Sequence, residues 1–155
     1  MTIAHHSKSI WLPRTSYMTL LRTNRRSRRC VPPRPAVSGD CVAKAVVLRD
    51  EYGYVLAIIP ASHHIRLQDL RMQLGLDVDL AAEYEIEELF DDCVSGAIPP
   101  VGECYGLDTV VDDSIEEQPE VYLEGGDHTT LIHISHAQFA SLTVTARRGC
   151  FSVRD

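Results

Sequence analysis

Short runs of apolar residues begin at Val42 and set the spacing of the expected elements. Val42 to Leu48 is rich in valine and loosely alternating, which favours a β-strand. A second run, Tyr54–Ile59, ends at Pro60, and the polar stretch Asp50–Gly53 supplies a turn between the two. The pattern therefore predicts an antiparallel hairpin.

The next apolar positions follow helical spacing. The first set predicts a short amphipathic helix that ends at Gly75 and carries Ile65, Leu67, Leu70 and Leu74. Asp79 is a candidate N-cap for a second helix that continues through Phe90. Its glutamates are expected to form a solvated face, and its expected inward residues are Leu80, Tyr84, Leu89 and Phe90.

Three more strands and one helix are expected towards the C-terminus. The strands cover Thr109–Val111, Val121–Leu123 and Thr130–Ile134, and Ser135 with Gln138 forms a capping-box pattern that opens the helix. A hairpin, two helices, then strands and a final helix indicate a mixed α+β domain rather than a doubly wound one.

Charge divides the chain into two parts. Residues 1–39 contain eight Lys or Arg residues and no acid, whereas the rest contains seven basic residues against 22 acidic ones. With 155 residues and 45% apolar content, we expect one globular domain at 37–155 and a basic arm at 1–36. Such a block is typical of a disordered tail or a nucleic-acid contact. It also resembles a transit peptide in composition, although its apolar residues form no sustained helical stripe.

The cysteine content indicates a reducing compartment. Five cysteines without a Cys-x-x-Cys pair predict neither a disulfide framework nor a zinc ribbon, and they favour the cytoplasm. No apolar run reaches the roughly 18 residues of a membrane helix, so no membrane partner is expected.

A stiff loop between Cys93 and Gly102 is the first candidate for chemistry. Gly96 allows close approach or a positive φ, and Pro99 and Pro100 fix the backbone and remove two donors. The remaining N–H groups are concentrated at 95–98, where they could bind a carbonyl or carboxylate oxygen. A turn without any functional role is the alternative.

Lys44 is the second candidate, because it lies in an otherwise apolar strand. Alternation places it on one face with Val42 and Val46, which is an unusual position for an ammonium unless that face lines a pocket. The alternative is an edge-strand lysine whose stem covers apolar surface.

Histidines and cysteines offer weaker hypotheses. His128, His133 and His136 could bind a metal, but no zinc motif is present, so surface or polar-core roles are favoured. Cys93 or Cys104 could act as a thiol nucleophile, but no partner histidine is implied locally, and a buried inert thiol is favoured.

In order along residues 40–145, these segments resemble the YbaK/prolyl-tRNA-synthetase-associated domain family of aminoacyl-tRNA deacylases. The resemblance is carried by Val42–Leu48, Val55–Pro60, Gly96–Gly102, Val111–Asp112 and Val121–Gly126. It implies a mixed, largely antiparallel curved sheet flanked by helices. It also implies an aminoacyl-tRNA substrate, an aminoacyl-tRNA synthetase as a possible partner, and neither a cofactor nor a metal.

The resemblance also implies site residues. Lys44 matches the family's essential strand lysine, and Gly96 matches the glycine of its Gly-x-x-x-Pro loop, so both are expected to be catalytic. The expected substrate-binding residues are Ala97, Ile98, Pro100, Gly102, Asp112, Gly125, Gly126, Asp127 and His128. No protein nucleophile is implied.

The implied function is the hydrolysis of the ester of a mischarged tRNA that carries a small amino acid. Such an ester is already activated, so positioning and main-chain donors suffice, and a small pocket acts as a size sieve. Two departures from the family are visible. Lys8–Pro35 matches none of its N-terminal pattern, as an unusual arm or a shifted reading frame would produce, and Leu131 replaces an acid. A catalytically impaired tRNA-binding module of the same fold is the alternative.

Overall fold

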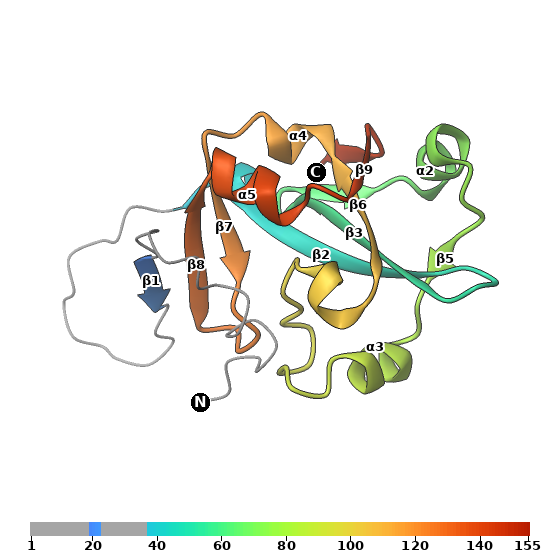
Figure 1. The fold of residues 1–155 in the computed structure, drawn as a ribbon, viewed down its shortest axis with the longest axis horizontal. Helices are drawn as coiled ribbons and strands as arrows, with labels where there is room; N and C mark the ends of the chain where they lie inside the picture. Colours follow the sequence, from blue (N-terminus) through green and yellow to red (C-terminus); the bar gives the residue numbers. More distant parts are fainter. Residues whose placement is uncertain (1–18, 23–36) are drawn as a thin grey trace.

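A computed structural model describes residues 19–22 and 37–155. The basic arm expected at 1–36 therefore lies outside the described residues, apart from 19–22. Within the described part, a large mixed sheet carries helices on both faces (Figure 1). Its strand order is β1 (Thr19–Arg22), β8 (Thr130–Ser135), β7 (Glu120–Glu124), β2 (Val42–Arg49), β3 (Tyr54–Pro60), β6 (Asp108–Asp112) and β9 (Arg147–Gly149).

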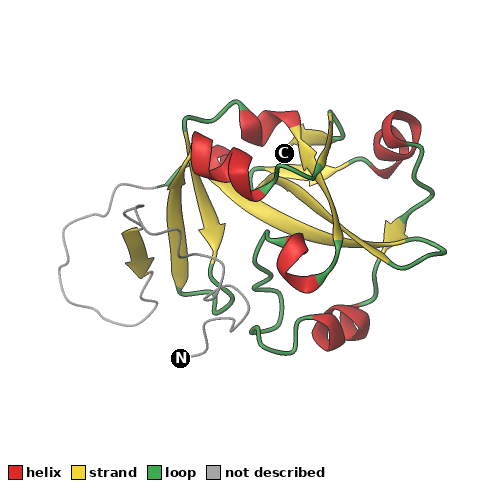
Figure 2. Ribbon diagram, viewed as in Figure 1, coloured by secondary structure: helices red, strands yellow, loops and turns green. Residues whose placement is uncertain are grey.

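Three short strands lie off this path. β5 (Asp79–Leu80) pairs with the end of β2, and β4 (His63–Ile65) pairs with β10 (Ser152–Arg154) in a small second sheet. The helices, red in Figure 2, are α2 (Leu67–Leu74), α3 (Glu83–Leu89), α4 (Asp113–Glu116) and α5 (His136–Leu142), with 3-10 turns η1 (Gly39–Cys41) and η2 (Gly102–Tyr105).

The predicted α+β class is confirmed. Pairs β1–β8, β7–β8, β2–β3, β2–β5 and β4–β10 are antiparallel, whereas β2–β7, β3–β6 and β6–β9 are parallel. The β2–β3 hairpin, the end of α2 at Gly75 and the capping box of α5 are also as predicted. Ile65, expected in the first helix, lies in β4 instead.

The predicted start of the second helix at Asp79 is wrong. Asp79 and Leu80 pair with β2, and α3 begins only after Ala82, whose N–H donates to the Glu85 carboxylate at 2.8 Å. Leu80 and Tyr84, expected to point inward, are exposed, while Phe90 is buried as expected. Glu85 departs from the solvated face because Arg49 and Tyr54 hold it at 2.9 and 3.0 Å.

Alternation along the β2–β3 hairpin separates two cores. Val46 and Leu48 pack with Leu70 and other apolar residues beneath α2. Ala45 and Val47 point to the opposite face, towards Phe90 and Ile98, and the same face further along packs against α4 and α5. Figure 1 accordingly shows α2 and α3 on opposite sides of the hairpin.

Candidate functional site

A cavity of about 320 Å³ opens between α3 and the proline-stiffened loop that follows it. Its walls include Ile86 and Phe90 from the α3 side. The loop contributes Cys93, Ser95 and Gly96, together with Ile98. Because Phe90 and Ile98 pack against Val47 and Leu56 in one core cluster, the floor of the cavity rests directly on the β2–β3 hairpin.

Buried residues and a tight turn hold the 93–102 loop rigid. Ala97 has no exposed surface, and Pro99 and Pro100 are also buried. The N–H of Ala97 donates to the Val94 carbonyl at 2.9 Å, which closes a tight turn, and Gly96 in that turn has a φ of +79°. This conformation is accessible to glycine and unfavourable for other residues, so the positive φ that the sequence allowed for at Gly96 is observed.

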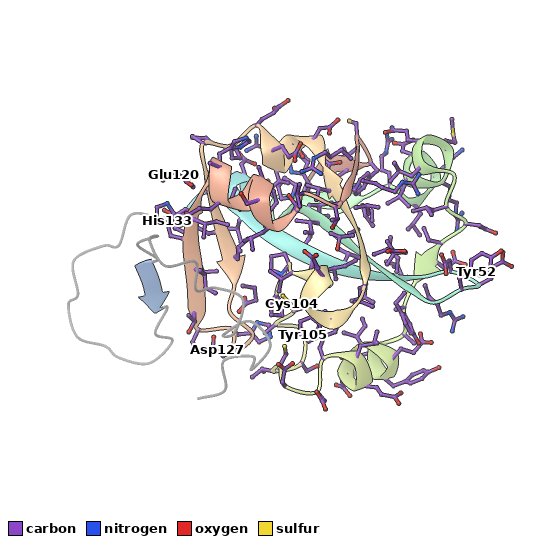
Figure 3. The ribbon with its side chains drawn as sticks, in the orientation of Figure 1. Tyr52, Cys104, Tyr105, Glu120, Asp127 and His133 are labelled. Carbon is purple, nitrogen blue, oxygen red and sulfur yellow. The ribbon has the colours of Figure 1, made fainter. Side chains whose placement is uncertain are left out.

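The turn between β7 and β8 meets the loop side by side. The N–H of Val94 donates to the Gly126 carbonyl at 2.9 Å, and Nε2 of His128 lies 2.7 Å from the Ser95 carbonyl oxygen. In Figure 3, Asp127 marks the turn between β7 and β8, and Cys104 and Tyr105 of η2 are labelled on the same side of the molecule. The structure thus brings together two sequence segments that the resemblance had assigned to one site.

Asp127 organises the β7–β8 turn. Its carboxylate accepts hydrogen bonds from the N–H groups of Thr129 and Thr130 at 2.9 and 2.7 Å, and from the Thr130 hydroxyl at 2.8 Å. Burial raises the pKa of Asp127, but these hydrogen bonds outweigh it, so the pKa lies below its ordinary value. This side chain therefore fixes the turn that supports the loop.

The lowered pKa of Asp127 predicts a loss of stability in acid. The charged form is favoured in the folded state, so the stabilisation is complete above the unfolded pKa of about 3.9 and is lost as pH falls through the folded value. We expect urea unfolding to show a smaller decline in stability from pH 7 to about pH 3 in Asp127→Asn than in the wild type. Equal declines in both proteins would contradict this prediction.

Unpaired main-chain donors are the chemically important feature of the loop. Within the part of the chain that the structure describes, the N–H groups of Ser95, Gly96 and Ile98 donate to no protein acceptor. All three residues line the cavity. Main-chain N–H groups held in a rigid loop can bind a carbonyl oxygen that gains negative charge, without any reorganisation during the reaction.

The thiol at the cavity is not activated. Burial raises the pKa of the Cys93 thiol to about 12, and Sγ lies 3.4 Å from Asp92 Oδ1 and 3.5 Å from the Tyr105 hydroxyl. Burial likewise raises the pKa of Cys104. Because the thiolate is the nucleophile, both cysteines are poor candidates for covalent catalysis at neutral pH.

Lys44 does not line this cavity. Its ammonium donates to the His63 carbonyl of β4 at 2.8 Å, and alternation places the side chain on the α2 face with Val46 and Leu48. The loop packs on the other face, against Ala45 and Val47. The structure thus confirms the predicted face of Lys44 but does not bring the ammonium to the Gly96 loop.

Two other expected substrate-binding residues lie in packed surroundings. Gly102 is buried at the start of η2, where an added Cβ atom would clash with Thr109 Oγ1. Asp112 is the N-cap of α4 and is 1% exposed. Gly125 and Gly126 lie in the turn against the loop, as does His128, and a Cβ on Gly125 would lie 2.9 Å from the Thr130 carbonyl oxygen.

The metal hypothesis gains no support from the geometry. In segments 19–22 and 37–155, no three His, Cys, Asp or Glu side chains gather in a way that could hold a metal ion. His128 contacts the loop, whereas His133 stacks on Tyr122 in the middle of the β7–β8 pair, and His136 begins α5. No helix of the described chain is long and apolar enough to span a membrane.

Some cavity residues were not expected from the sequence. Ile86 forms part of the α3 wall, and Glu87 accepts a hydrogen bond from the Ser95 hydroxyl at 3.1 Å. The helical spacing of four residues from Ile86 to Phe90 is the signal that could have identified the first. Nothing in the local pattern distinguishes Glu87 from its acidic neighbours.

Comparison with known proteins defines the class of this chain as an aminoacyl-tRNA editing domain. The sequence pattern of the aminoacyl-tRNA editing domain family matches residues 32–142, so the chain belongs to this family. The comparison with curated proteins found no match.

Solved structures share the fold at low sequence identity. A proposed signal transduction protein from Marinobacter aquaeolei VT8 has 23% identity and a TM-score of 0.72, over 88% of this chain and 28% of its own length. A proposed trans-editing enzyme for prolyl tRNA synthetase has 19% identity and a TM-score of 0.70, over 88% and 87%. The hypothetical protein APE2540 has 22% identity and a TM-score of 0.69, over 88% and 92%.

Proposed function

We propose that this chain is a trans-editing aminoacyl-tRNA deacylase that hydrolyses the ester of a mischarged tRNA carrying a small amino acid. The observation that carries the proposal is the set of unpaired N–H groups at Ser95, Gly96 and Ile98 around one cavity. The proposal also includes a cytoplasmic location, which the cysteine content favours, and association with an aminoacyl-tRNA synthetase, which the resemblance implies.

The proposed reaction needs no covalent intermediate with the protein. Water attacks the ester carbonyl carbon, the carbonyl oxygen becomes an oxyanion, and the Gly96 N–H with its neighbours stabilises that charge. The bond from carbon to the ribose oxygen of the terminal adenosine then breaks, and that oxygen takes up a proton. The products are the free amino acid and the deacylated tRNA.

The dimensions of the cavity support a small acyl group. Its volume of about 320 Å³ lies at the lower end of the roughly 300–1,000 Å³ of ligand pockets. Ile86, Phe90 and Ile98 supply apolar walls for a short side chain. A larger, correctly attached amino acid would be excluded by size, which adds to the selectivity of about 1–3 kcal/mol that one methylene provides.

A panel of aminoacyl-tRNAs tests the proposal. We expect the purified chain to release at least one small amino acid from tRNA faster than spontaneous hydrolysis, and to leave phenylalanyl-tRNA intact. Gly96→Val serves as the inactive control. Release at the background rate from every tRNA, with wild type and variant indistinguishable, would refute the proposal.

Cys93 provides a separate test of the absence of a protein nucleophile. Because its thiol is protonated at neutral pH, we expect Cys93→Ala to retain deacylation within about threefold. Single-turnover assays with a small aminoacyl-tRNA measure this, with Cys104→Ala as the matched control. An inactive Cys93→Ala, together with an acyl-thioester trapped on the wild-type protein, would contradict it.

Lys44 is proposed as a catalytic residue on the basis of the resemblance alone. Since its ammonium donates to the His63 carbonyl on the opposite face, a direct role requires a different conformation of this part of the chain. The resemblance predicts that Lys44→Ala lowers kcat by at least about 100-fold with little change in melting temperature. Activity within about threefold of wild type, with a lowered melting temperature, would restrict Lys44 to holding β4.

The position of Lys44 is also the observation that favours the alternative, a tRNA-binding module without turnover. In that case the chain binds tRNA in a salt-sensitive manner but releases no amino acid. Binding measured at two salt concentrations alongside the deacylation panel separates the two functions. Residues 40–155 contain seven basic residues against 22 acidic ones and are a poor electrostatic match for tRNA. We therefore propose that the basic N-terminal segment supplies the attraction for tRNA.

A further inference from the structure

The four residues Val94–Ala97 form a turn of a particular kind. The Ala97 N–H donates to the Val94 carbonyl at 2.9 Å, and Gly96, the third residue, has a φ of +79°. A positive φ of this size at the third position is the signature of a type II turn. The peptide unit between Ser95 and Gly96 is its central peptide, and it supplies one of the unpaired N–H groups of the cavity.

A type II turn has a close alternative. Rotation of the central peptide by about half a turn gives a type I turn, in which the third residue has a negative φ. Glycine tolerates both forms, so the residue at position 96 does not choose between them. In the rotated form the Ser95 carbonyl oxygen, a negative dipole end, replaces the Gly96 N–H on the same side of the loop.

His128 holds this peptide by its oxygen. Its Nε2 lies 2.7 Å from the Ser95 carbonyl oxygen, and the described chain contains no cis peptide bond. In a trans peptide the C=O and N–H groups point in opposite directions. The contact with His128 therefore keeps the Gly96 N–H directed away from the imidazole, while Gly96 itself lines the cavity.

The backbone of His128 is itself unusual. Its φ of 57° is the one positive value at a non-glycine residue in the described chain. The side chain of Glu124 accepts hydrogen bonds from the N–H groups of Gly126 and His128 at 3.3 and 3.2 Å, and Asp127 fixes the following residues. Unfavourable backbone conformations persist where the surrounding structure enforces them, often at functional sites.

We propose that His128 is a positioning residue: it holds the central peptide of the Val94–Ala97 turn so that the Gly96 N–H stays directed at the acyl carbonyl of the substrate. The role concerns the proposed deacylase site and rests on that function. Loss of the contact lets the central peptide rotate, and the developing oxyanion then meets a carbonyl oxygen instead of a donor. The effect falls on the transition state, and hence on kcat rather than on KM.

Two substitutions separate the hydrogen bond from the backbone conformation. His128→Gly removes the imidazole and accommodates the positive φ, so folding is preserved. His128→Gln keeps a side-chain N–H donor of similar reach. We expect His128→Gly to lower kcat by at least about tenfold with KM within about threefold of wild type, and His128→Gln to restore most of kcat. His136→Gln, an exposed histidine outside the turn, is the control.

Nuclear magnetic resonance reports the turn directly, without any turnover. In a type II turn the Ser95 α-proton lies close to the Gly96 amide proton. In a type I turn the amide protons of Ser95 and Gly96 lie close to each other. We expect the first nuclear Overhauser contact in the wild type and in His128→Gln, and a growing second contact in His128→Gly.

The outcomes are distinct. Unchanged kcat and unchanged contacts in His128→Gly would overturn the positioning role, and so would a rise in KM with kcat unchanged, which would indicate direct binding of substrate. If the wild type releases no amino acid at all, the deacylase proposal fails, while the resonance comparison still decides whether His128 holds the turn.

Discussion

Gly96→Val is expected to lower kcat/KM for deacylation by about 100-fold or more, because removal of one oxyanion donor costs roughly 10²–10³ in rate. The φ of +79° at Gly96 is unfavourable for any side chain and most of all for a β-branched one. A Cβ there would make only ordinary contacts, 3.5 Å from His128 Nε2, so the strain is in the backbone. The turn relieves it by rotating the Gly96 peptide out of line with the substrate.

A matched glycine on the other side of the sheet provides the control. Gly75 has a φ of +64° at the end of α2, and a Cβ atom added there would meet nothing within 4 Å. Gly75→Val therefore has a similar backbone cost, about 1–2 kcal/mol, without touching the cavity. Single-turnover assays and thermal unfolding of both variants give the comparison. Equal loss of activity in the two proteins would show that destabilisation alone explains the effect.

Asp112→Ala is expected to show the opposite behaviour: a large loss of stability with little change in activity. The carboxylate, 1% exposed, accepts hydrogen bonds from the N–H groups of Phe151 and Ser152 at 2.8 Å each, and from the N–H of Ser114 at 3.0 Å. The Ser114 hydroxyl also donates to it. Burial raises the pKa of Asp112, but these hydrogen bonds outweigh it and lower the pKa overall.

Removing this acceptor leaves several donors without a partner in a buried region. The cost is about 3–5 kcal/mol, which corresponds to a fall of roughly 10 °C in melting temperature. Urea unfolding measures the loss of stability. The kcat values of wild type and variant are compared at a temperature below the melting temperature of either protein. Asp113→Ala, at the exposed neighbouring residue, is the control. If Asp112 binds substrate, as the resemblance implies, Asp112→Ala also lowers kcat/KM well beyond the Asp113→Ala value.

The sequence predicted those elements that are determined by residues close together along the chain. The β2–β3 hairpin, the glycine end of α2 and the capping box of α5 all depend on residues close together in sequence. The start of α3 failed because Asp79, a good N-cap residue, is drawn into pairing with Arg49 of β2. The short pairing of β4 with β10 joins residues about 90 positions apart, and three-residue strands carry almost no pattern of their own.

The candidate site was predictable in its parts but not in its assembly. The glycine and proline spacing identified the 93–102 loop, and the paired glycines identified the 125–128 turn. Only the tertiary structure shows that the N–H of Val94 donates a hydrogen bond to the Gly126 carbonyl. Alternation correctly grouped Lys44 with Val46 on one face of β2. It could not indicate which face carries the cavity, because both faces of a central strand are covered.

The pairing of residues 19–22 with β8 bears on how the basic segment is studied. β1 supplies backbone partners along β8 from Thr130 to His133. A chain shortened to begin at Val37 would leave these amide and carbonyl groups without neighbours, and an open sheet border of this kind invites self-association. A loss of tRNA affinity after such a truncation could then result either from the removal of basic charge or from the exposure of the β8 edge. Replacing arginines of the segment outside 19–22 with glutamine, at constant chain length, removes charge and leaves the border covered.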